Sequence, residues 1–84
     1  MEKEIVIYTS ASCLYCHQQK EWMDKNSIKY QEKDIGKNAD YHRELIEAKA
    51  MGVPYTVIKY PNGENSEGVV GFNKERLKDL LLEQ

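Results

Sequence analysis

The feature that most constrains this chain is a pair of cysteines between a predicted strand and a predicted helix. Cys13-Leu14-Tyr15-Cys16 holds both cysteines of the chain and follows the apolar run Ile5-Val6-Ile7-Tyr8. The first N–H groups of a helix have no partner within the helix, and the helix dipole is positive there. Both effects favour a thiolate at Cys13, and the thiolate is the nucleophile in disulfide exchange. A second thiol at Cys16 can then displace whatever the first has bound. The pattern therefore predicts a dithiol redox site.

Length and charge limit the classes of protein that fit. The chain has 84 residues, which is the length of one small domain spanning 1–84. A Cys13–Cys16 bridge would close a very short loop and constrain little of the unfolded chain, so its value would be chemical rather than structural. The formal charge is −2, and Lys and Arg are scattered among Asp and Glu without a basic stripe. We therefore expect no nucleic-acid partner.

The polar start of the sequence bears on the compartment. Met1-Glu2-Lys3-Glu4 is polar, and the apolar run that follows is too short for the apolar region of a signal peptide. No segment has the length needed to span a bilayer, so no membrane partner is expected. We expect a cytoplasmic protein, monomeric by default. In a reducing cytoplasm a lone cysteine pair is more often catalytic or metal-binding than structural.

Hydrophobic periodicity and turn residues predict seven elements. Strands are expected at 4–9, 28–34, 54–60 and 67–70, the second at an edge of the sheet. Helices are expected at 13–25, 39–50 and 74–82. We expect Ser12 to help cap the first helix, Gly52 to terminate the second and Asn73 to cap the third. Pro61-Asn62-Gly63 predicts a turn between the last two strands.

Helical spacing also predicts which side chains face the core. These are Cys16, Gln19, Trp22 and Met23 in the first helix; Tyr41, Leu45, Ile46, Ala48 and Met51 in or after the second; and Leu77, Leu80 and Leu81 in the third.

The element order is βαβαββα, which is an α/β fold. A helix joins the first two strands, so they should be parallel with a right-handed crossover. The last two strands should form an antiparallel hairpin in the same sheet. Because the first strand is apolar throughout, helices must cover both faces of this four-stranded mixed sheet.

Four short segments of the chain resemble the landmarks of the glutaredoxin family. They are Ile7-Tyr8-Thr9, Cys13-Leu14-Tyr15-Cys16, Gly52-Val53-Pro54 and Gly71-Phe72. The resemblance extends from Ile5 to Leu82 in spacing and element order. It implies the thioredoxin (glutaredoxin-like) fold and a thiol–disulfide oxidoreductase that serves electron transport and cell redox homeostasis. Disulfide-containing proteins or small molecules would be its substrates, and no tightly bound cofactor is implied.

The resemblance also implies roles for individual residues. Cys13 would be the attacking nucleophile and Cys16 the resolving thiol. Val53-Pro54 would carry a cis peptide bond beside the dithiol, leaving the Val53 backbone free to pair with an extended substrate. Tyr15 would be exposed next to the site and shape which partners dock. Gly71 and Phe72 complete the expected substrate-binding residues, although Phe72 equally fits a packing role.

Departures from the family pattern leave the physiological reductant open. Ser10 stands where many glutaredoxins carry a basic residue, and Gly52 stands where they usually carry Thr. Val70-Gly71-Phe72-Asn73 replaces the stretch that often holds glutathione. One alternative is therefore glutathione as the reductant. The other is a redoxin that donates electrons to ribonucleotide reductase and is recharged by thioredoxin reductase.

Metal binding is the alternative from a different class. Cys13, Cys16, His17 and His42 could supply four ligands, but their spacing is unlike that of a zinc knuckle. An iron–sulfur cluster bridged between two chains would need external thiols. Cys-x-x-Cys-His also spells a haem-attachment pattern, but that attachment requires export. We expect His17 to be a surface residue beside the site, and no resident metal.

Substitution of the two cysteines separates exchange from metal binding. We expect Cys13→Ser to abolish disulfide exchange, because it removes the nucleophile. Cys16→Ser should accumulate a mixed disulfide at Cys13, detectable by mass spectrometry, because no resolving thiol remains. Retained activity in Cys13→Ser, or loss of a stoichiometric metal in Cys16→Ser, would overturn the exchange assignment.

Overall fold

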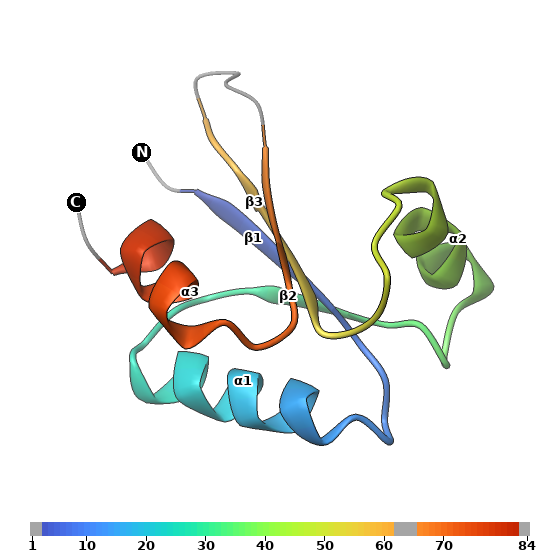
Figure 1. Ribbon diagram of the computed structural model, residues 1–84, viewed down its shortest axis with the longest axis horizontal. Coiled ribbons are helices and arrows are strands. Elements are labelled where there is room, and N and C mark those ends of the chain that lie inside the picture. The colour runs from blue at the N-terminus through green and yellow to red at the C-terminus, as the bar shows by residue number, and fades with distance from the viewer. Residues whose placement is uncertain (1–2, 62–65, 83–84) are drawn as a thin grey trace.

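The computed structural model describes residues 3–61 and 66–82 and has the element order expected from the sequence (Figure 1). The strands are β1 (Glu4–Thr9), β2 (Gln31–Asp34), β3 (Tyr55–Lys59) and β4 (Glu67–Val70), and the helices are α1 (Leu14–Lys25), α2 (Ala39–Glu47) and α3 (Lys74–Leu81).

The strands form one four-stranded sheet in the order β2-β1-β3-β4. β1 is parallel to β2, with Ile7 opposite Glu32, and antiparallel to β3, with Ile7 opposite Thr56. β3 and β4 form the antiparallel hairpin. The predicted mixed sheet and the edge position of β2 are therefore confirmed.

Alternate residues of β1 face opposite sides of the sheet, and helices cover both sides (Figure 1). Ile5 and Ile7 pack with Met23 of α1 and Ile58 of β3, and Leu80 and Leu81 of α3 lie against this cluster. On the other face Val6 and Tyr8 pack with Leu45 of α2. Because both faces are buried, β1 is apolar at consecutive positions rather than alternating.

Each helix begins at a residue whose side chain accepts a backbone N–H. Asn38 accepts from Asp40 at the start of α2, and Asn73 accepts from Arg76 at the start of α3, as predicted for Asn73. At α1 the prediction of Ser12 as a cap was wrong by one residue. Cys13 is the N-cap, and it lies outside the helix that we expected it to begin.

The end of α2 differs most from the prediction. The helix stops at Glu47 with Ala48 as its C-cap, three residues before the predicted end. Lys49, and not Gly52, takes the left-handed conformation there, with φ of 60°. Because the helix ends early, Met51 lies outside it, while Ala50 still packs against the cluster of Val6, Tyr8 and Leu45.

Three predicted core residues in and after α2 are exposed, and two of them, Ala48 and Met51, lie beyond the early end of the helix. Leu45 is buried and Tyr41 is partly buried, as predicted. The prediction was wrong for Ile46, which is 60% exposed, for Met51, which is 94% exposed, and for Ala48. In α1, by contrast, Cys16, Gln19 and Met23 are all buried as expected.

The remaining differences are small shifts at element ends. β2 begins at Gln31 instead of residue 28, and α3 ends at Leu81 with Leu82 as its C-cap. Asn62 and Gly63 of the predicted turn lie outside the described residues. In the described part of the chain, every helix is too short or too polar to cross a membrane.

Two isoleucines provide a matched test of this core. We expect Ile58→Ala to lower the free energy of unfolding by about 2–5 kcal/mol, because Ile58 is fully buried. Ile46→Ala should change it by about 0.5 kcal/mol or less, because Ile46 is mostly exposed. Urea unfolding monitored by circular dichroism measures both. Equal losses would contradict the placement of α2.

Candidate active site

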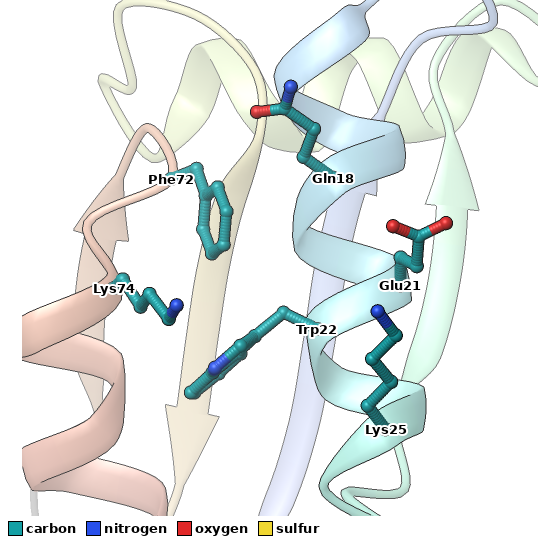
Figure 2. Close-up of a pocket in the computed structure, with 6 residues that line it drawn as sticks. All are labelled: Gln18, Glu21, Trp22, Lys25, Phe72 and Lys74. Carbon is teal, nitrogen blue, oxygen red and sulfur yellow. The ribbon is translucent and has the colours of Figure 1, made fainter.

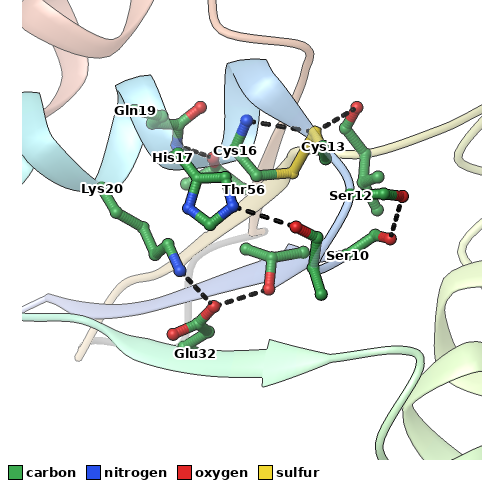
Figure 3. The surroundings of a disulfide bond; sticks show 12 residues. Ser10, Ser12, Cys13, Cys16, His17, Gln19, Lys20, Glu32 and Thr56 are labelled. Carbon is green, nitrogen blue, oxygen red and sulfur yellow. Dashed lines mark hydrogen bonds and ion pairs between the residues drawn. A yellow bond between two sulfur atoms is a disulfide. The ribbon is translucent and has the colours of Figure 1, made fainter.

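The two cysteines form a disulfide at the N-terminus of α1 (Figure 3). Their Cα atoms are 5.2 Å apart. The Cys13 sulfur serves as the helix cap and accepts the backbone N–H of Cys16 at 3.1 Å. An anionic sulfur at this position would accept the same N–H more strongly and would face the positive end of the helix dipole. The geometry therefore favours the thiolate form of Cys13 after reduction.

The two sulfurs differ in their access to solvent. Cys16 lies in the first turn of α1 and is fully buried, whereas Cys13 is partly exposed. Tyr15, between them, is 62% exposed, as predicted. An external thiol or disulfide therefore reaches Cys13, and Cys16 reacts only from within the molecule.

The loop before β3 lies directly beside Cys13. The Val53–Pro54 peptide bond is cis, as the family resemblance implied. The Val53 carbonyl oxygen is 3.7 Å from the Cys13 sulfur. In the disulfide this sulfur carries no proton, so the approach is a contact and not a hydrogen bond. The Gly71 N–H donates to the Pro54 carbonyl at 2.7 Å, which ties the loop before α3 to the same site.

Gly71 and Phe72 take different positions relative to the disulfide. Gly71 has φ of 78°, a left-handed conformation that glycine adopts without steric cost. Phe72 packs against Trp22 of α1, with ring centroids 6.2 Å apart. Packing is therefore the role that the structure shows for Phe72.

Phe72 also borders a shallow pocket between α1 and the start of α3 (Figure 2). The pocket has a volume of about 380 Å³. Neither cysteine lines it, so it lies apart from the reacting sulfurs. Its lining residues are Gln18, Glu21, Trp22, Lys25, Phe72 and Lys74.

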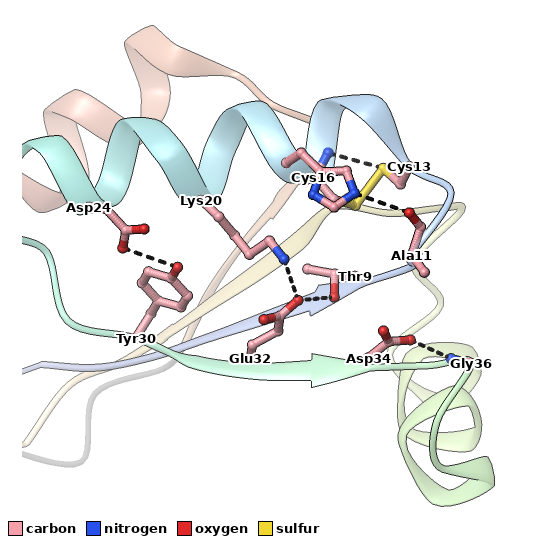
Figure 4. A network of polar contacts seen from close by, with 11 residues as sticks. Thr9, Ala11, Cys13, Cys16, Lys20, Asp24, Tyr30, Glu32, Asp34 and Gly36 are labelled. Atoms are coloured by element: carbon pink, nitrogen blue, oxygen red, sulfur yellow. Dashed lines mark hydrogen bonds and ion pairs between the residues drawn. A yellow bond between two sulfur atoms is a disulfide. The ribbon is translucent and has the colours of Figure 1, made fainter.

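A polar network joins α1 to the sheet near the disulfide (Figure 4). Glu32 of β2 accepts hydrogen bonds from Thr9 of β1 and from Lys20 of α1, both at 2.7 Å. This network was not predicted from the sequence. The alternation of residues 28–34, which places Glu32 on the same side as Tyr30, was the signal that could have indicated it. The alternation did not indicate that the side of the strand carrying Glu32 faces α1.

The network lowers the pKa of Glu32 below its ordinary value of 4.5. Partial burial acts to raise this pKa, but the hydrogen bonds from Lys20 and Thr9 and the Lys20 charge lower it more. The carboxylate is therefore ionised at neutral pH and holds the Lys20 ammonium near the sheet.

A second polar pair lies deeper under α1. The Gln19 amide nitrogen donates to the Thr56 hydroxyl, and both side chains are fully buried. Thr56 follows Pro54 by two residues, so this pair connects α1 to the strand that begins at the cis peptide.

The histidines lie outside any cluster of ligands. His17 is exposed, with its Nε2 3.0 Å from the Ala11 carbonyl oxygen, and His42 lies on α2. Within 3–61 and 66–82, no three His, Cys, Asp or Glu side chains come together in a group that could hold a metal ion.

Comparison with solved structures places this architecture among the thioredoxin-like folds. The thioredoxin-like protein BC3987 superposes with a TM-score of 0.79 and 33% identity, covering 93% of this chain and all of that one. A glutaredoxin from Archaeoglobus fulgidus superposes with a TM-score of 0.73 over 96% of this chain and 87% of that one; at 20% identity it supports the fold alone. The protein is therefore a redoxin of the thioredoxin-like class.

Sequence comparison identifies the family within that class. The glutaredoxin family profile matches residues 5–60. Glutaredoxin 1 of Rickettsia prowazekii is 32% identical over 82 residues, which cover 94% of this chain and 86% of that protein. The chain belongs to the glutaredoxin family.

The Glu32 network predicts a specific dependence of stability on pH. Because the pKa of Glu32 is lowered in the folded state, its contribution is present above pH 4.5 and is lost as the pH falls through the folded-state value. Lys20→Met should therefore flatten the loss of stability below pH 4.5, as measured by urea unfolding at a series of pH values.

Arg43→Met is the matched control, because the Arg43–Asp40 pair is about two-thirds exposed on both sides. It should leave the acid dependence close to that of the wild type, since exposed pairs contribute little. Flattening of equal size in both variants would contradict a special role for Glu32.

Proposed function

We propose that this glutaredoxin-family protein reduces disulfides through Cys13 and Cys16. The Cys13 thiolate attacks a substrate disulfide, forms a mixed disulfide and releases one substrate thiolate, which takes a proton. Cys16 then loses its proton and attacks the Cys13 sulfur, which releases the second substrate thiol. Two electrons pass to the substrate, and the Cys13–Cys16 disulfide is the oxidised product.

The observation that carries this proposal is the contrast between the two sulfurs. The Cys13 sulfur is partly exposed, caps α1 and accepts a backbone N–H, while Cys16 is buried one turn further along. Nucleophilic attack needs an accessible sulfur with thiolate character, and resolution needs a second sulfur within bonding reach. The pair meets both requirements.

Exposed apolar side chains near the disulfide support the proposal that its substrates are proteins. Leu14 and Tyr15 adjoin Cys13, Met51 precedes the loop of Val53, and Val70 precedes Gly71. Large apolar side chains exposed around a reactive group are typical of a surface that other proteins contact. An extended substrate segment would pair with the Val53 backbone.

A second candidate concerns the source of electrons. The Asn73 side chain already accepts the Arg76 N–H, and the Gly71 N–H already donates to Pro54. Both groups lie in the stretch where glutaredoxins often hold glutathione, and both are engaged within the protein. These contacts argue against glutathione as the reductant. The alternative is recharging by thioredoxin reductase, with ribonucleotide reductase as the leading target.

A comparison of two recharging systems tests both proposals. One assay supplies glutathione, glutathione reductase and NADPH; the other supplies thioredoxin reductase and NADPH. Each follows NADPH oxidation during reduction of a protein disulfide. We expect turnover with thioredoxin reductase and slow or absent turnover with glutathione.

Cys13→Ser is the control in both assays and should give no turnover. Efficient turnover with glutathione alone would reject thioredoxin reductase as the reductant but keep the oxidoreductase. If neither assay gives turnover, although dithiothreitol reduces the Cys13–Cys16 disulfide of the same protein, the oxidoreductase proposal is rejected.

A further inference from the structure

Gln19 is a buried polar residue whose hydrogen bonding is incomplete. It lies on α1 three residues after Cys16, and its side chain is fully buried. The amide nitrogen donates to Thr56 and lies 3.7 Å from the Met23 sulfur. The amide oxygen is buried and has no hydrogen-bond partner among the residues that the structure describes. Buried polar atoms are nearly always paired, so this oxygen needs an explanation.

Helix geometry places this oxygen on the face of α1 that carries Cys16. Residues three apart lie next to each other along a helix, with Cβ atoms about 5–6 Å apart. Helical side chains also lean toward the N-terminus, here toward Cys16. The Gln19 nitrogen faces Met23, one turn toward the C-terminus, so the oxygen occupies the other side of the amide. Figure 3 shows the Gln19 side chain beside the turn that holds Cys16.

The need for an acceptor at this position depends on the oxidation state. In the disulfide the Cys16 sulfur has no proton and can donate nothing. After reduction Cys16 becomes a buried thiol, because the helix terminus favours the anionic form at Cys13. That S–H is fully shielded from water, so any hydrogen bond it donates must be accepted inside the protein.

We propose that the Gln19 amide oxygen accepts a hydrogen bond from the Cys16 thiol in the reduced protein. The oxygen is unpaired in the disulfide form and paired in the dithiol form, so it stabilises the reduced state relative to the oxidised state. Gln19 is thus a positioning residue that sets the redox equilibrium of the pair. This inference deepens the proposed function and rests on it.

Reduction of the disulfide adds one proton at the Cys16 sulfur. Reduced dithiothreitol breaks the Cys13–Cys16 bond and forms its own disulfide, so two electrons pass to the protein. One of its two protons goes to the Cys16 sulfur, and the other leaves to water when Cys13 is a thiolate. Gln19 exchanges no electron or proton; it only accepts the hydrogen bond.

The redox equilibrium of two variants tests the proposal. Gln19→Met removes the amide at nearly constant volume, and Thr56→Val removes only the partner of the amide nitrogen. Each purified protein is equilibrated with dithiothreitol at defined ratios of reduced to oxidised reagent, and its oxidised fraction is measured by thiol labelling. We expect Gln19→Met to lower the equilibrium constant for reduction about tenfold, a shift of about 30 mV to more negative potential for a two-electron couple.

The matched variant Thr56→Val distinguishes the effect of the Gln19 amide oxygen from the effect of the hydrogen bond made by its amide nitrogen. Thr56→Val should leave the equilibrium constant within about twofold of the wild type, because it retains the Gln19 amide oxygen as an acceptor. An unchanged constant in Gln19→Met would overturn the proposal, and so would an equal shift in both variants. No partner enzyme enters this measurement, so its result is separate from failure of turnover in the recharging assays.

A second measurement needs no variant and covers the case in which Gln19→Met does not fold. The side-chain carbonyl carbon of Gln19 is followed by NMR in the oxidised and reduced wild-type protein. A hydrogen bond accepted only in the reduced form should move this resonance to higher shift on reduction, while Gln18, which is exposed, should not move. An unmoved Gln19 resonance would show that the Cys16 proton is held elsewhere, for example by a backbone carbonyl, and would reject the proposal.

Discussion

Burial of β1 on both faces is the constraint on which the rest of the structure depends. Ile5 and Ile7 pack under α1 and α3, Val6 and Tyr8 pack under α2, and both edges of the strand are paired. A strand surrounded in this way has no freedom to shift in register, because a slip of one residue would exchange its two faces. The fixed register of β1 therefore fixes the position of the loop that follows it. Helix α1 starts after this loop, with Cys13 as its N-cap.

The chemistry of the site follows from which groups the helix start exposes and which it buries. A sulfur at the cap receives a backbone N–H and is partly exposed to solvent, and a sulfur three residues later is fully buried. Beneath α1 the sheet presents polar groups as well as apolar ones. Glu32 and Lys20 pair at the partly exposed edge, while Gln19 and Thr56 pair in the interior. Interior polar groups are costly unless they are paired, and the Gln19 oxygen, unpaired within the described part of the chain, is the basis for proposing a hydrogen bond that forms only after reduction.

Local signals predicted most of the fold and the reacting pair. Strand burial, helix periodicity and the spacing of Cys13 and Cys16 are properties of neighbouring residues, and the structure confirms them. The end of α2 was not predictable in the same way. The apolar residues Ala48 and Met51 continue a helical pattern, but Lys49 takes a left-handed conformation that a sequence pattern does not single out. Helix ends depend on small differences between caps, and the prediction that Gly52 terminates α2 is wrong for this reason.

By itself, the sequence determined the order of elements, the buried central strand and the dithiol at a helix start, because each depends on periodicity or spacing within a short segment. The family resemblance implied the cis Val53–Pro54 bond beside the dithiol, but only the tertiary structure decided the contacts around it. The Val53 carbonyl lies 40 residues from Cys13 in the chain and within contact distance in space, and Glu32 meets Lys20 and Thr9 only because β2 pairs with β1 beneath α1. Contacts of this kind depend on strand pairing and helix packing over the whole sheet, which local periodicity does not specify.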